Sequence, residues 1–328
     1  MKFAVFGAGA IGGFLAAMLH RAGQDVSLVV RGPALAAIRE RGLRVELPAE
    51  TIRFAPVCSD DPSALGPHDV VLVTTKATAL PQVARTIAPL LAPSTVVVFV
   101  VNGIPWWYFH GEGGAYEGRR IERLDPGGLA WDAIGPERVL GGTVNAMCTA
   151  LEPGVVQVIN FAGPCTLTLG EPAGGLSTRL RDVVAAFGSG FLAVDAAERI
   201  RQAVWTKLIL NLSSAPLAAV TGARLKDLFA SEVIGEARRR LHEESEAIAA
   251  AMGYPVHLDA DKALEGARRS GHRPSMAQDF SARRPIELDA ICTVPLEFAR
   301  LHGVPTPMLD LFVELARLRA VEDGLYPG

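Results

Sequence analysis

The first third of the chain alternates between short apolar runs and segments in which hydrophobic residues recur every three to four positions. A short apolar run bounded by turn residues is typical of a strand, and a recurrence near 3.6 residues is typical of a helix. Strands that alternate with helices indicate a parallel sheet covered by helices. The pattern predicts strands at residues 2–6 and 26–30, helices at 11–21 and 33–41, and short strands near Val45 and Ile52.

Two longer apolar runs, at residues 69–74 and 95–101, show no alternation of polar and apolar positions. Strands with this pattern are buried on both faces, as in the centre of a parallel sheet. Further strands are predicted between residues 139 and 169 and near 191–194. The N-terminal part is therefore predicted to form a doubly wound, mostly parallel sheet.

The hydrophobic period becomes helical near residue 198. From there on the pattern predicts helices that are separated near Pro216, Gly253, Pro274, Pro285 and Pro305. A chain of 328 residues is long enough for two hydrophobic cores. We expect a sheet domain at residues 1–197 and an all-helical domain at residues 198–328.

Composition and charge narrow the class of protein. With 49% hydrophobic and 20% charged residues the chain is typical of a globular protein, and its net charge of -3 gives no general attraction to nucleic acid or an anionic membrane. The N-terminus leads directly into a strand without a signal-peptide pattern, and no uninterrupted apolar run reaches membrane-spanning length. We expect a cytoplasmic protein that binds neither nucleic acid nor membranes.

Cysteine and histidine spacing gives no metal signature. The four cysteines are widely scattered without a CxxC pair, and the seven histidines contain no HExxH pair. We expect reduced thiols, no disulfide and no metal site.

The turn after the first predicted strand has the sequence Gly7-Ala8-Gly9-Ala10-Ile11-Gly12. In such a turn the first glycine allows the tight bend, the second lets the backbone approach a pyrophosphate, and the third lets the next helix pack closely on the strand. The motif follows a predicted strand and opens a predicted helix, which is the context it requires. Residues 7–12 are therefore predicted to bind a dinucleotide in a Rossmann-type domain. A glycine turn in another kind of α/β protein is the alternative.

Basic and amide residues follow the other predicted strands. After the second strand an NAD site usually has an acidic residue against the ribose hydroxyls, so Arg31 favours NADP (NADPH) instead. Lys76 and Asn102-Gly103 follow the two central strands, at the edge of the sheet where ligands bind. The alternatives are a solvated arginine, a solvated lysine and a common Asn-Gly turn.

Lysine is rare in this chain, since only five of the 32 basic residues are lysines. Lys207 lies among apolar neighbours, and a desolvated ammonium can give up a proton whereas a guanidinium cannot. Lys207 is therefore the leading candidate for a proton donor. Asn211 follows one helical turn later, so the pair could bind the oxygens of a 2-oxo acid. Alternatively, Lys207 extends its ammonium to solvent from an amphipathic helix and Asn211 is a buried, hydrogen-bonded amide.

A third polar cluster contains Ser275 and Glu287. Ser275 with Gln278 also fits a capping box, and Pro285 with Glu287 fits the start of a helix. On these residues alone, helix capping explains the cluster as well as a functional role does.

Taken together, these features resemble the ketopantoate reductase (2-dehydropantoate 2-reductase) family over nearly the full chain. The resemblance rests on the order and spacing of the glycine turn with Arg31, the two strand ends, the helix with Lys207 and Asn211, and Ser275 followed by Glu287. It implies an NADPH-dependent enzyme that reduces 2-dehydropantoate to pantoate in pantothenate and coenzyme A biosynthesis. It further implies a sheet domain for the cofactor and a helical domain for substrate and catalysis.

The resemblance also implies a role for each candidate residue. Lys207 would donate the proton, and Glu287 would contact the cofactor ribose and orient the lysine. Asn102, Asn211 and Ser275 would hold the substrate. The implied cofactor-binding residues are Gly7, Ala8, Gly9, Ala10, Ile11, Gly12, Arg31, Lys76, Asn102 and Glu287.

The chain departs from the family pattern at three places. Ala215 stands where the family commonly has a second asparagine two turns after the lysine, and Leu225 replaces another polar residue. The aromatic stretch at residues 106–131 is longer than in compact members; it could form a lid, a subunit contact of a homodimer, or an outer hydrophobic layer. The more apolar pocket leaves two alternatives: a different, less polar 2-oxo or 2-hydroxy acid as substrate, and a non-catalytic NADP sensor.

Overall fold

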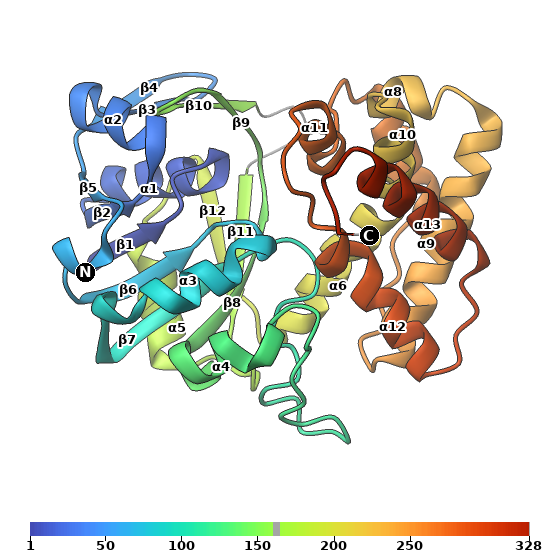
Figure 1. The fold of residues 1–328 in the computed structure, drawn as a ribbon, viewed down its shortest axis with the longest axis horizontal. Coiled ribbons are helices and arrows are strands. Elements are labelled where there is room, and N and C mark those ends of the chain that lie inside the picture. The colour runs from blue at the N-terminus through green and yellow to red at the C-terminus, as the bar shows by residue number, and fades with distance from the viewer. Residues whose placement is uncertain (160–164, 328) are drawn as a thin grey trace. The chain divides into compact units, whose positions relative to one another are not determined.

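The computed structural model describes residues 1–159 and 165–327 (Figure 1). Residues 160–164, which fall within the predicted strand region 139–169, and residue 328 lie outside the described residues. The chain divides into two compact units. Unit 1 comprises Met1–Val101 and Pro105–Ile200, and unit 2 comprises Asn102–Ile104 and Arg201–Gly328.

Unit 1 is built on a sheet of eight strands in the order β12-β11-β8-β7-β6-β1-β2-β5 (Figure 1). Neighbouring described strands are parallel, apart from the antiparallel pair of β8 and β11. This confirms the predicted, mostly parallel sheet. The strands are β1 (Lys2–Phe6), β2 (Asp25–Val29), β5 (Val57–Ser59), β6 (His68–Val73), β7 (Leu91–Val100), β8 (Val139–Asn145), β11 (Cys165–Gly170) and β12 (Leu192–Ala196).

Both faces of this sheet are covered because its central strands are apolar on both sides. Phe3 of β1 belongs to a buried layer that includes Phe14 of α1 and Leu180 of α5. On the opposite face of the sheet, Phe99 of β7 packs edge-to-face against Trp106, with ring centroids 5.5 Å apart. The helices of unit 1 are α1 (Ala10–Arg21), α2 (Gly32–Arg41), α3 (Leu80–Thr86), α4 (Leu129–Ile134) and α5 (Thr178–Ala186), with short 3-10 turns η1 (Pro62–Ala64), η2 (Ala77–Ala79), η3 (Ala88–Leu90), η4 (Pro126–Gly128) and η5 (Pro136–Arg138).

The aromatic run after β7 packs into unit 1 as a hydrophobic layer. Trp106, Trp107, Tyr108 and Phe109 are each at most 3% exposed. A Cβ on Gly141 would lie 2.4 Å from the Trp107 ring, so the glycine makes room for the indole. The alternatives for residues 106–131 were a lid, a subunit contact and a hydrophobic layer, and these four buried side chains form a hydrophobic layer.

A second sheet in unit 1 has the order β4-β3-β10-β9, formed by β3 (Leu43–Glu46), β4 (Thr51–Phe54), β9 (Met147–Glu152) and β10 (Val155–Ile159). The strands predicted near Val45 and Ile52 are present, but they pair with each other and with β10 instead of joining the main sheet. Burial alternates along β3, as in a strand with one face on a core. Such alternation indicates a half-buried strand without specifying its neighbours.

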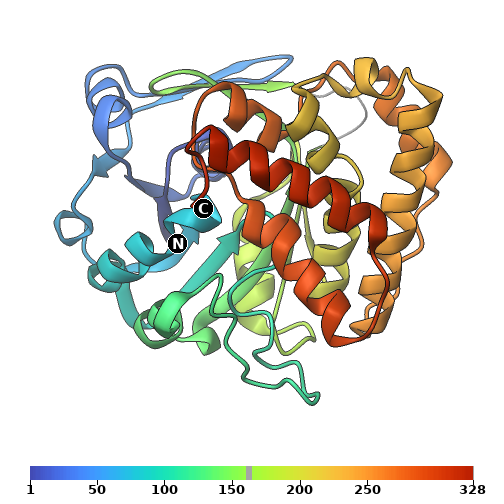
Figure 2. The ribbon, with the colours of Figure 1, turned by 45° about the vertical axis from the view of Figure 1, so that its right-hand side comes forward.

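Unit 2 is helical over its described elements, as predicted. Its helices are α6 (Ile200–Leu212), α7 (Ala215–Thr221), α8 (Leu225–Leu228), α9 (Glu232–Ala251), α10 (Ala260–Arg269), α11 (Ser275–Ser281), α12 (Val294–Leu301) and α13 (Pro307–Glu322). A π-helical turn, Asp289–Thr293, leads directly into α12. The long helix α13, drawn in dark red in Figure 2, packs against α7 and α9.

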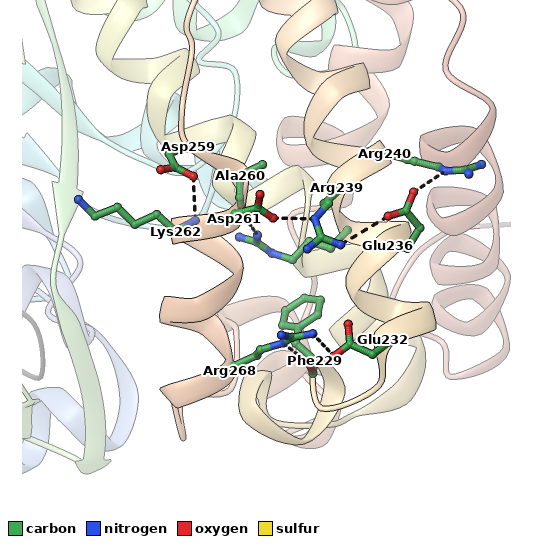
Figure 3. A network of polar contacts seen from close by, with 11 residues as sticks. Phe229, Glu232, Glu236, Arg239, Arg240, Asp259, Ala260, Asp261, Lys262 and Arg268 are labelled. Atoms are coloured by element: carbon green, nitrogen blue, oxygen red, sulfur yellow. Dashed lines mark hydrogen bonds and ion pairs between the residues drawn. The ribbon is translucent and has the colours of Figure 1, made fainter.

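Ion pairs join the surface helices of unit 2 (Figure 3). Arg239 on α9 pairs with Asp261 on α10 at 2.7 Å, and Arg268 on α10 pairs with Glu232 on α9, also at 2.7 Å. The Arg268 Nε additionally donates to the Phe229 carbonyl at 3.0 Å. Exposed ion pairs of this kind contribute little to stability, because water and salt screen the charges.

One described stretch, the 22 residues of Ile200–Thr221, is long and apolar enough to cross a membrane. However, most of its apolar part is buried inside the structure, and the stretch is interrupted between α6 and α7. These are the properties of a buried core helix.

Candidate active site

The glycine turn joins β1 to α1 and is fixed by the neighbouring strands. Gly7 has a φ of 103°, a backbone conformation that residues with side chains rarely adopt. Its N–H donates to the Val29 carbonyl at 2.9 Å, and its carbonyl accepts from Thr74 Oγ1 at 2.7 Å. Because Val29 ends β2 and Thr74 follows β6, the turn is held between the two strands that flank β1.

Gly12 and Gly9 are needed for different reasons. A Cβ on Gly12 would lie 1.9 Å from the Gly7 carbonyl oxygen and 2.4 Å from Thr74 Oγ1, so α1 approaches the turn only with glycine at this place. A Cβ on Gly9 would meet no atom within 4 Å, and the φ of Gly9 is an ordinary -74°. The protein's own packing therefore does not require glycine at residue 9, whereas close approach of a ligand to the backbone does.

The N-terminus of α1 fits an anionic ligand. The helix begins at Ala10 without a capping side-chain hydrogen bond and without an acidic residue in its first turn. Its first N–H groups and the positive end of its dipole therefore favour a phosphate group. Together with the space beside Gly9, these features fit the pyrophosphate of a dinucleotide at residues 7–12.

Two basic residues follow the strands on either side of β1. Arg31, after β2, is exposed at the start of α2, and no described acidic residue forms an ion pair with it. Lys76, after β6, is partly buried at the start of η2. Since β2, β1 and β6 are parallel neighbours, Arg31, the glycine turn and Lys76 lie along one edge of the sheet. Open α/β sheets bind their ligands at this edge.

Within unit 2, three residues far apart in the sequence form a hydrogen-bonded group, here called the Lys207 cluster. Lys207 Nζ donates to Asn102 Oδ1 at 2.8 Å, and Asn102 Nδ2 donates to Glu287 Oε2 at 3.5 Å. These pairs are separated by 105 and 185 positions. The structure thus brings together the predicted proton donor, the carboxylate predicted to orient it, and one predicted ligand-binding amide.

Burial lowers the pKa of Lys207 from 10.5 to about 8, because desolvation disfavours the charged ammonium; the negative charge of Glu287 opposes part of this change. Glu287 is only 7% exposed, so little water screens it. An ammonium with this pKa is still largely charged at neutral pH, yet it releases its proton more readily than an exposed lysine does. Lys207 is therefore suited to act as a general acid.

Asn211 and Ser275 make no side-chain hydrogen bond to the Lys207 cluster among the described residues. Asn211 is partly buried on α6, one turn after Lys207, and Ser275 is the exposed first residue of α11. No side chain caps α11, whose N-terminal flanking residue is Pro274. The capping box considered for Ser275 and Gln278 is therefore wrong.

The remaining candidates lie at or near the starts of helices. Glu287 directly precedes the helical residues that begin at Leu288 and continue through the π-helical turn Asp289–Thr293 into α12, and its carbonyl accepts from the N–H of Ile291 at 3.1 Å, so the helix start predicted at Pro285 and Glu287 is confirmed. Ala215 is the buried first residue of α7, and Leu225 is the partly buried first residue of α8. Both departures from the family pattern thus fall at helix starts.

Two contacts of the site have no clear sequence signal. Thr74 binds the Gly7 carbonyl, and a threonine after a strand is too common to indicate this role. Gly103 has a φ of 80°, and a Cβ added at this residue would lie 2.2 Å from the Ala290 carbonyl oxygen. The Asn-Gly pair indicates a positive φ, but it does not reveal a contact with a residue that lies far along the chain.

The described residues contain no group of three or more His, Cys, Asp or Glu side chains that could hold a metal ion. All four cysteines are free thiols. Burial raises the pKa of the Cys148 and Cys292 thiols well above its usual range, so neither is suited to act as a nucleophile at neutral pH.

A Rossmann-type sheet with a glycine turn of the dinucleotide-binding pattern, together with a helical unit that holds a partly buried, hydrogen-bonded lysine, is typical of the class of dinucleotide-dependent oxidoreductases. Residues 3–106 match the family Ketopantoate reductase PanE/ApbA, and residues 199–320 match Ketopantoate reductase PanE/ApbA C terminal. A 2-dehydropantoate 2-reductase of Mesorhizobium japonicum is 40% identical to this chain, covering 99% of it and 100% of the relative. The chain belongs to the ketopantoate reductase PanE/ApbA family, whose members use a nicotinamide cofactor.

Solved structures show the same architecture. A protein of Ralstonia solanacearum that is provisionally named a ketopantoate reductase has a TM-score of 0.91 and 36% identity, covering 99% of both chains. The 2-dehydropantoate 2-reductase of Geobacter metallireducens has a TM-score of 0.84 and 25% identity, covering 97% of this chain and 99% of its own. A D-mandelate dehydrogenase, solved with NADH and anilino(oxo)acetate, shares the fold with a TM-score of 0.82, at 20% identity over 99% of this chain and 100% of its own.

Proposed function

We propose that this protein is a cytoplasmic, NADPH-dependent 2-oxo acid reductase, with 2-dehydropantoate as the leading substrate and pantoate as the product. The reaction would supply pantothenate and coenzyme A biosynthesis. The observation that carries the proposal is the Lys207 cluster, in which a lysine with a pKa lowered to about 8 is hydrogen-bonded to Asn102.

When bound, NADPH would supply a hydride for the carbonyl carbon of the 2-oxo acid and would be left as NADP+. Lys207 Nζ gives a proton to the carbonyl oxygen as negative charge develops there, so a secondary alcohol and a neutral amine result. Asn102 holds the ammonium in place before the transfer, and Glu287 in turn holds the amide of Asn102. Asn211 and Ser275 contribute an amide and a hydroxyl that can bind the substrate's polar groups.

We assign cofactor binding to the edge of the main sheet and to two residues of the Lys207 cluster. Residues 7–12 would bind the pyrophosphate, Arg31 the additional phosphate of NADPH, and Lys76, Asn102 and Glu287 the remainder of the cofactor. In this assignment residues 1–197 form the cofactor domain and residues 198–328 form the substrate and catalytic domain.

Steady-state kinetics with Lys207→Ala tests the proposal. The wild type should oxidise NADPH in a saturable, 2-dehydropantoate-dependent manner, and the variant should lose at least about a hundredfold in kcat, the usual contribution of a general acid. NADPH binding, followed by its fluorescence, should persist in the variant. Lys262→Ala, an exposed lysine of α10, is the control and should retain full activity. A wild type that is inert toward a broad panel of 2-oxo acids would overturn the proposal.

A second candidate is a reductase for a less polar 2-oxo acid, or a dehydrogenase for the corresponding 2-hydroxy acid. It is favoured by Ala215, which is only 5% exposed and lacks the amide common in the family, and by Leu225. The loss of one substrate hydrogen bond costs about 1 kcal/mol, enough to change substrate preference without changing the chemistry. A substrate screen in which 2-dehydropantoate has the highest kcat/KM would remove this candidate. Turnover of any 2-oxo acid would equally dispose of a non-catalytic NADP sensor.

A further inference from the structure

The π-helical turn before α12 contains a carbonyl that its own helix cannot pair. The N–H of Val294 donates to the Asp289 carbonyl, five residues earlier, as is characteristic of a π-helix. By the same pattern, residue 295 would donate to Ala290. Residue 295 is Pro295, which is buried and has no N–H. The Ala290 carbonyl is therefore left without this intrahelical donor.

The Ala290 carbonyl is paired by a segment from far away in the sequence. Ile104 N–H donates to it at 2.7 Å. Gly103 permits this approach, because its φ is 80° and a Cβ there would lie 2.2 Å from the same oxygen. The three residues Asn102–Ile104 consequently belong to unit 2, although the residues before and after them belong to unit 1.

This backbone contact adjoins the Lys207 cluster on both sides. Asn102, two residues before Ile104, binds Lys207 Nζ through Oδ1 and faces Glu287 through Nδ2. On the other side, the Glu287 carbonyl accepts from the N–H of Ile291, the residue next to Ala290, at 3.1 Å. The same turn therefore positions the carboxylate and, through Ala290, the amide.

We propose that Pro295 is a positioning residue: by removing a competing N–H, it keeps the Ala290 carbonyl available to Ile104 and so fixes Asn102 between Lys207 and Glu287. The contact between Ile104 and Ala290 is called the backbone clamp below. The clamp is a property of the fold, and its effect on catalysis rests on the reductase function proposed above.

Pro295→Ala provides a direct test because it restores the N–H without adding bulk. The new N–H competes with Ile104 for the Ala290 carbonyl, so the segment 102–104 should detach more often. The variant also exchanges a proline for a better helix former and loses two buried methylene groups, so its change in stability is measured separately by thermal unfolding. Pro307→Ala, which replaces the exposed proline at the start of α13, is the matched control.

Hydrogen exchange followed by mass spectrometry reports the clamp independently of activity. In Pro295→Ala the amide of Ile104 should exchange about tenfold faster, and Pro307→Ala should leave it unchanged. Gly103→Ala, which pushes on the clamp from the other side, should give the same increase. Unchanged exchange at Ile104 in Pro295→Ala would overturn the clamp, even if the protein has no reductase activity at all.

The kinetic part of the test separates positioning from general stability. Pro295→Ala should lower kcat about tenfold while the KM for NADPH changes by less than about twofold. Because the ammonium loses a hydrogen-bond acceptor, the fall of kcat/KM at high pH should move to lower pH. Faster exchange with an unchanged pH profile and unchanged kcat would show that the clamp positions nothing that matters for the reaction. An inactive wild type would contradict the proposed function and leave the exchange result to decide the clamp.

Discussion

Lys207 illustrates how far a single residue can be understood from sequence alone. The scarcity of lysine and the apolar neighbours of Lys207 predict a desolvated amine, and burial does lower its pKa to about 8. Its hydrogen-bond partner Asn102 could not be derived from the sequence, because no local pattern relates residues separated by 105 positions. The family resemblance implied that Asn102 binds ligands and that Glu287 orients the lysine, and only the structure shows that Asn102 accepts a hydrogen bond from Lys207.

Glu287→Gln tests the electrostatic part of the site. The Glu287 charge raises the pKa of Lys207 against the desolvation that lowers it, so the neutral amide should bring the pKa below about 8. Since the protonated lysine is the active form, kcat/KM falls as the pH rises through this pKa. The basic limb of the pH profile should therefore move to lower pH in the variant. Glu265→Gln, at an exposed residue of α10, should leave the profile in place, and an unshifted limb in Glu287→Gln would contradict the assignment.

Arg31→Ala tests the choice of cofactor. The exposed guanidinium lies at the start of α2 with no described ionic partner, so its replacement should affect the ligand more than the fold. Losing a charge-assisted contact with the additional phosphate should raise the KM for NADPH about tenfold or more and leave the KM for NADH within about twofold. The comparison uses both cofactors with wild type, Arg31→Ala and Arg41→Ala, an exposed arginine at the other end of the same helix. An equal rise of the KM for NADPH and for NADH would show that Arg31 does not bind the additional phosphate of NADPH.

At the scale of elements, the β1–α1 junction was the most predictable part of the molecule. A glycine motif between an apolar run and a helical period specifies a tight turn, a close helix and a direction of the chain, and all three are present. The pairing of β3 and β4 in a second sheet was not predictable, because alternation of hydrophobic residues identifies a strand's buried face and not its neighbour. The π-helical turn Asp289–Thr293 was equally hidden, because it lies between the helix breaks predicted near Pro285 and Pro305 and leaves no mark of its own in the hydrophobic period.

The two glycines of this junction make a matched pair of variants. Gly12→Ala places a methyl group 1.9 Å from the Gly7 carbonyl oxygen, so it should cost about 1–3 kcal/mol or more of unfolding free energy. Gly9→Ala meets no protein atom within 4 Å, and because the poorer N-cap is offset by the smaller conformational entropy of the unfolded chain, its unfolding free energy should stay within about 0.5 kcal/mol of the wild type. Its affinity for NADPH should nevertheless fall about tenfold or more, because the methyl group occupies the approach to the backbone.

Urea unfolding and NADPH titration of both variants distinguish these two roles. The expected pattern is a stability defect in Gly12→Ala and a binding defect with normal stability in Gly9→Ala. Normal NADPH affinity in Gly9→Ala would contradict the placement of the pyrophosphate beside this residue, whatever the behaviour of Gly12→Ala.

At the scale of the whole molecule, the chain passes between the two compact units three times. It enters unit 2 at Asn102, returns to unit 1 at Pro105, and enters unit 2 again at Arg201. A change of hydrophobic period marks the last passage in the sequence. The first two passages enclose only the three residues Asn102–Ile104 at a strand end, too few to form a sequence pattern. These three residues are held in unit 2 by the Ile104–Ala290 hydrogen bond. The residues that sequence analysis could not place are therefore those whose position depends on a contact with a distant helix.

The apolar stretch Ile200–Thr221 leads to a prediction about the behaviour of the intact protein. By length and composition it could cross a membrane, but it contains the charged Lys207, whose cost at a bilayer centre is about 2.5–3.5 kcal/mol, and it is interrupted between α6 and α7. Its buried face instead contributes to the core of a folded unit. After cell lysis without detergent and ultracentrifugation, the full chain should remain in the supernatant and elute as a defined species in size-exclusion chromatography. Recovery in the membrane pellet, with release by detergent and not by salt, would mean that this stretch is a membrane anchor and would contradict the cytoplasmic assignment.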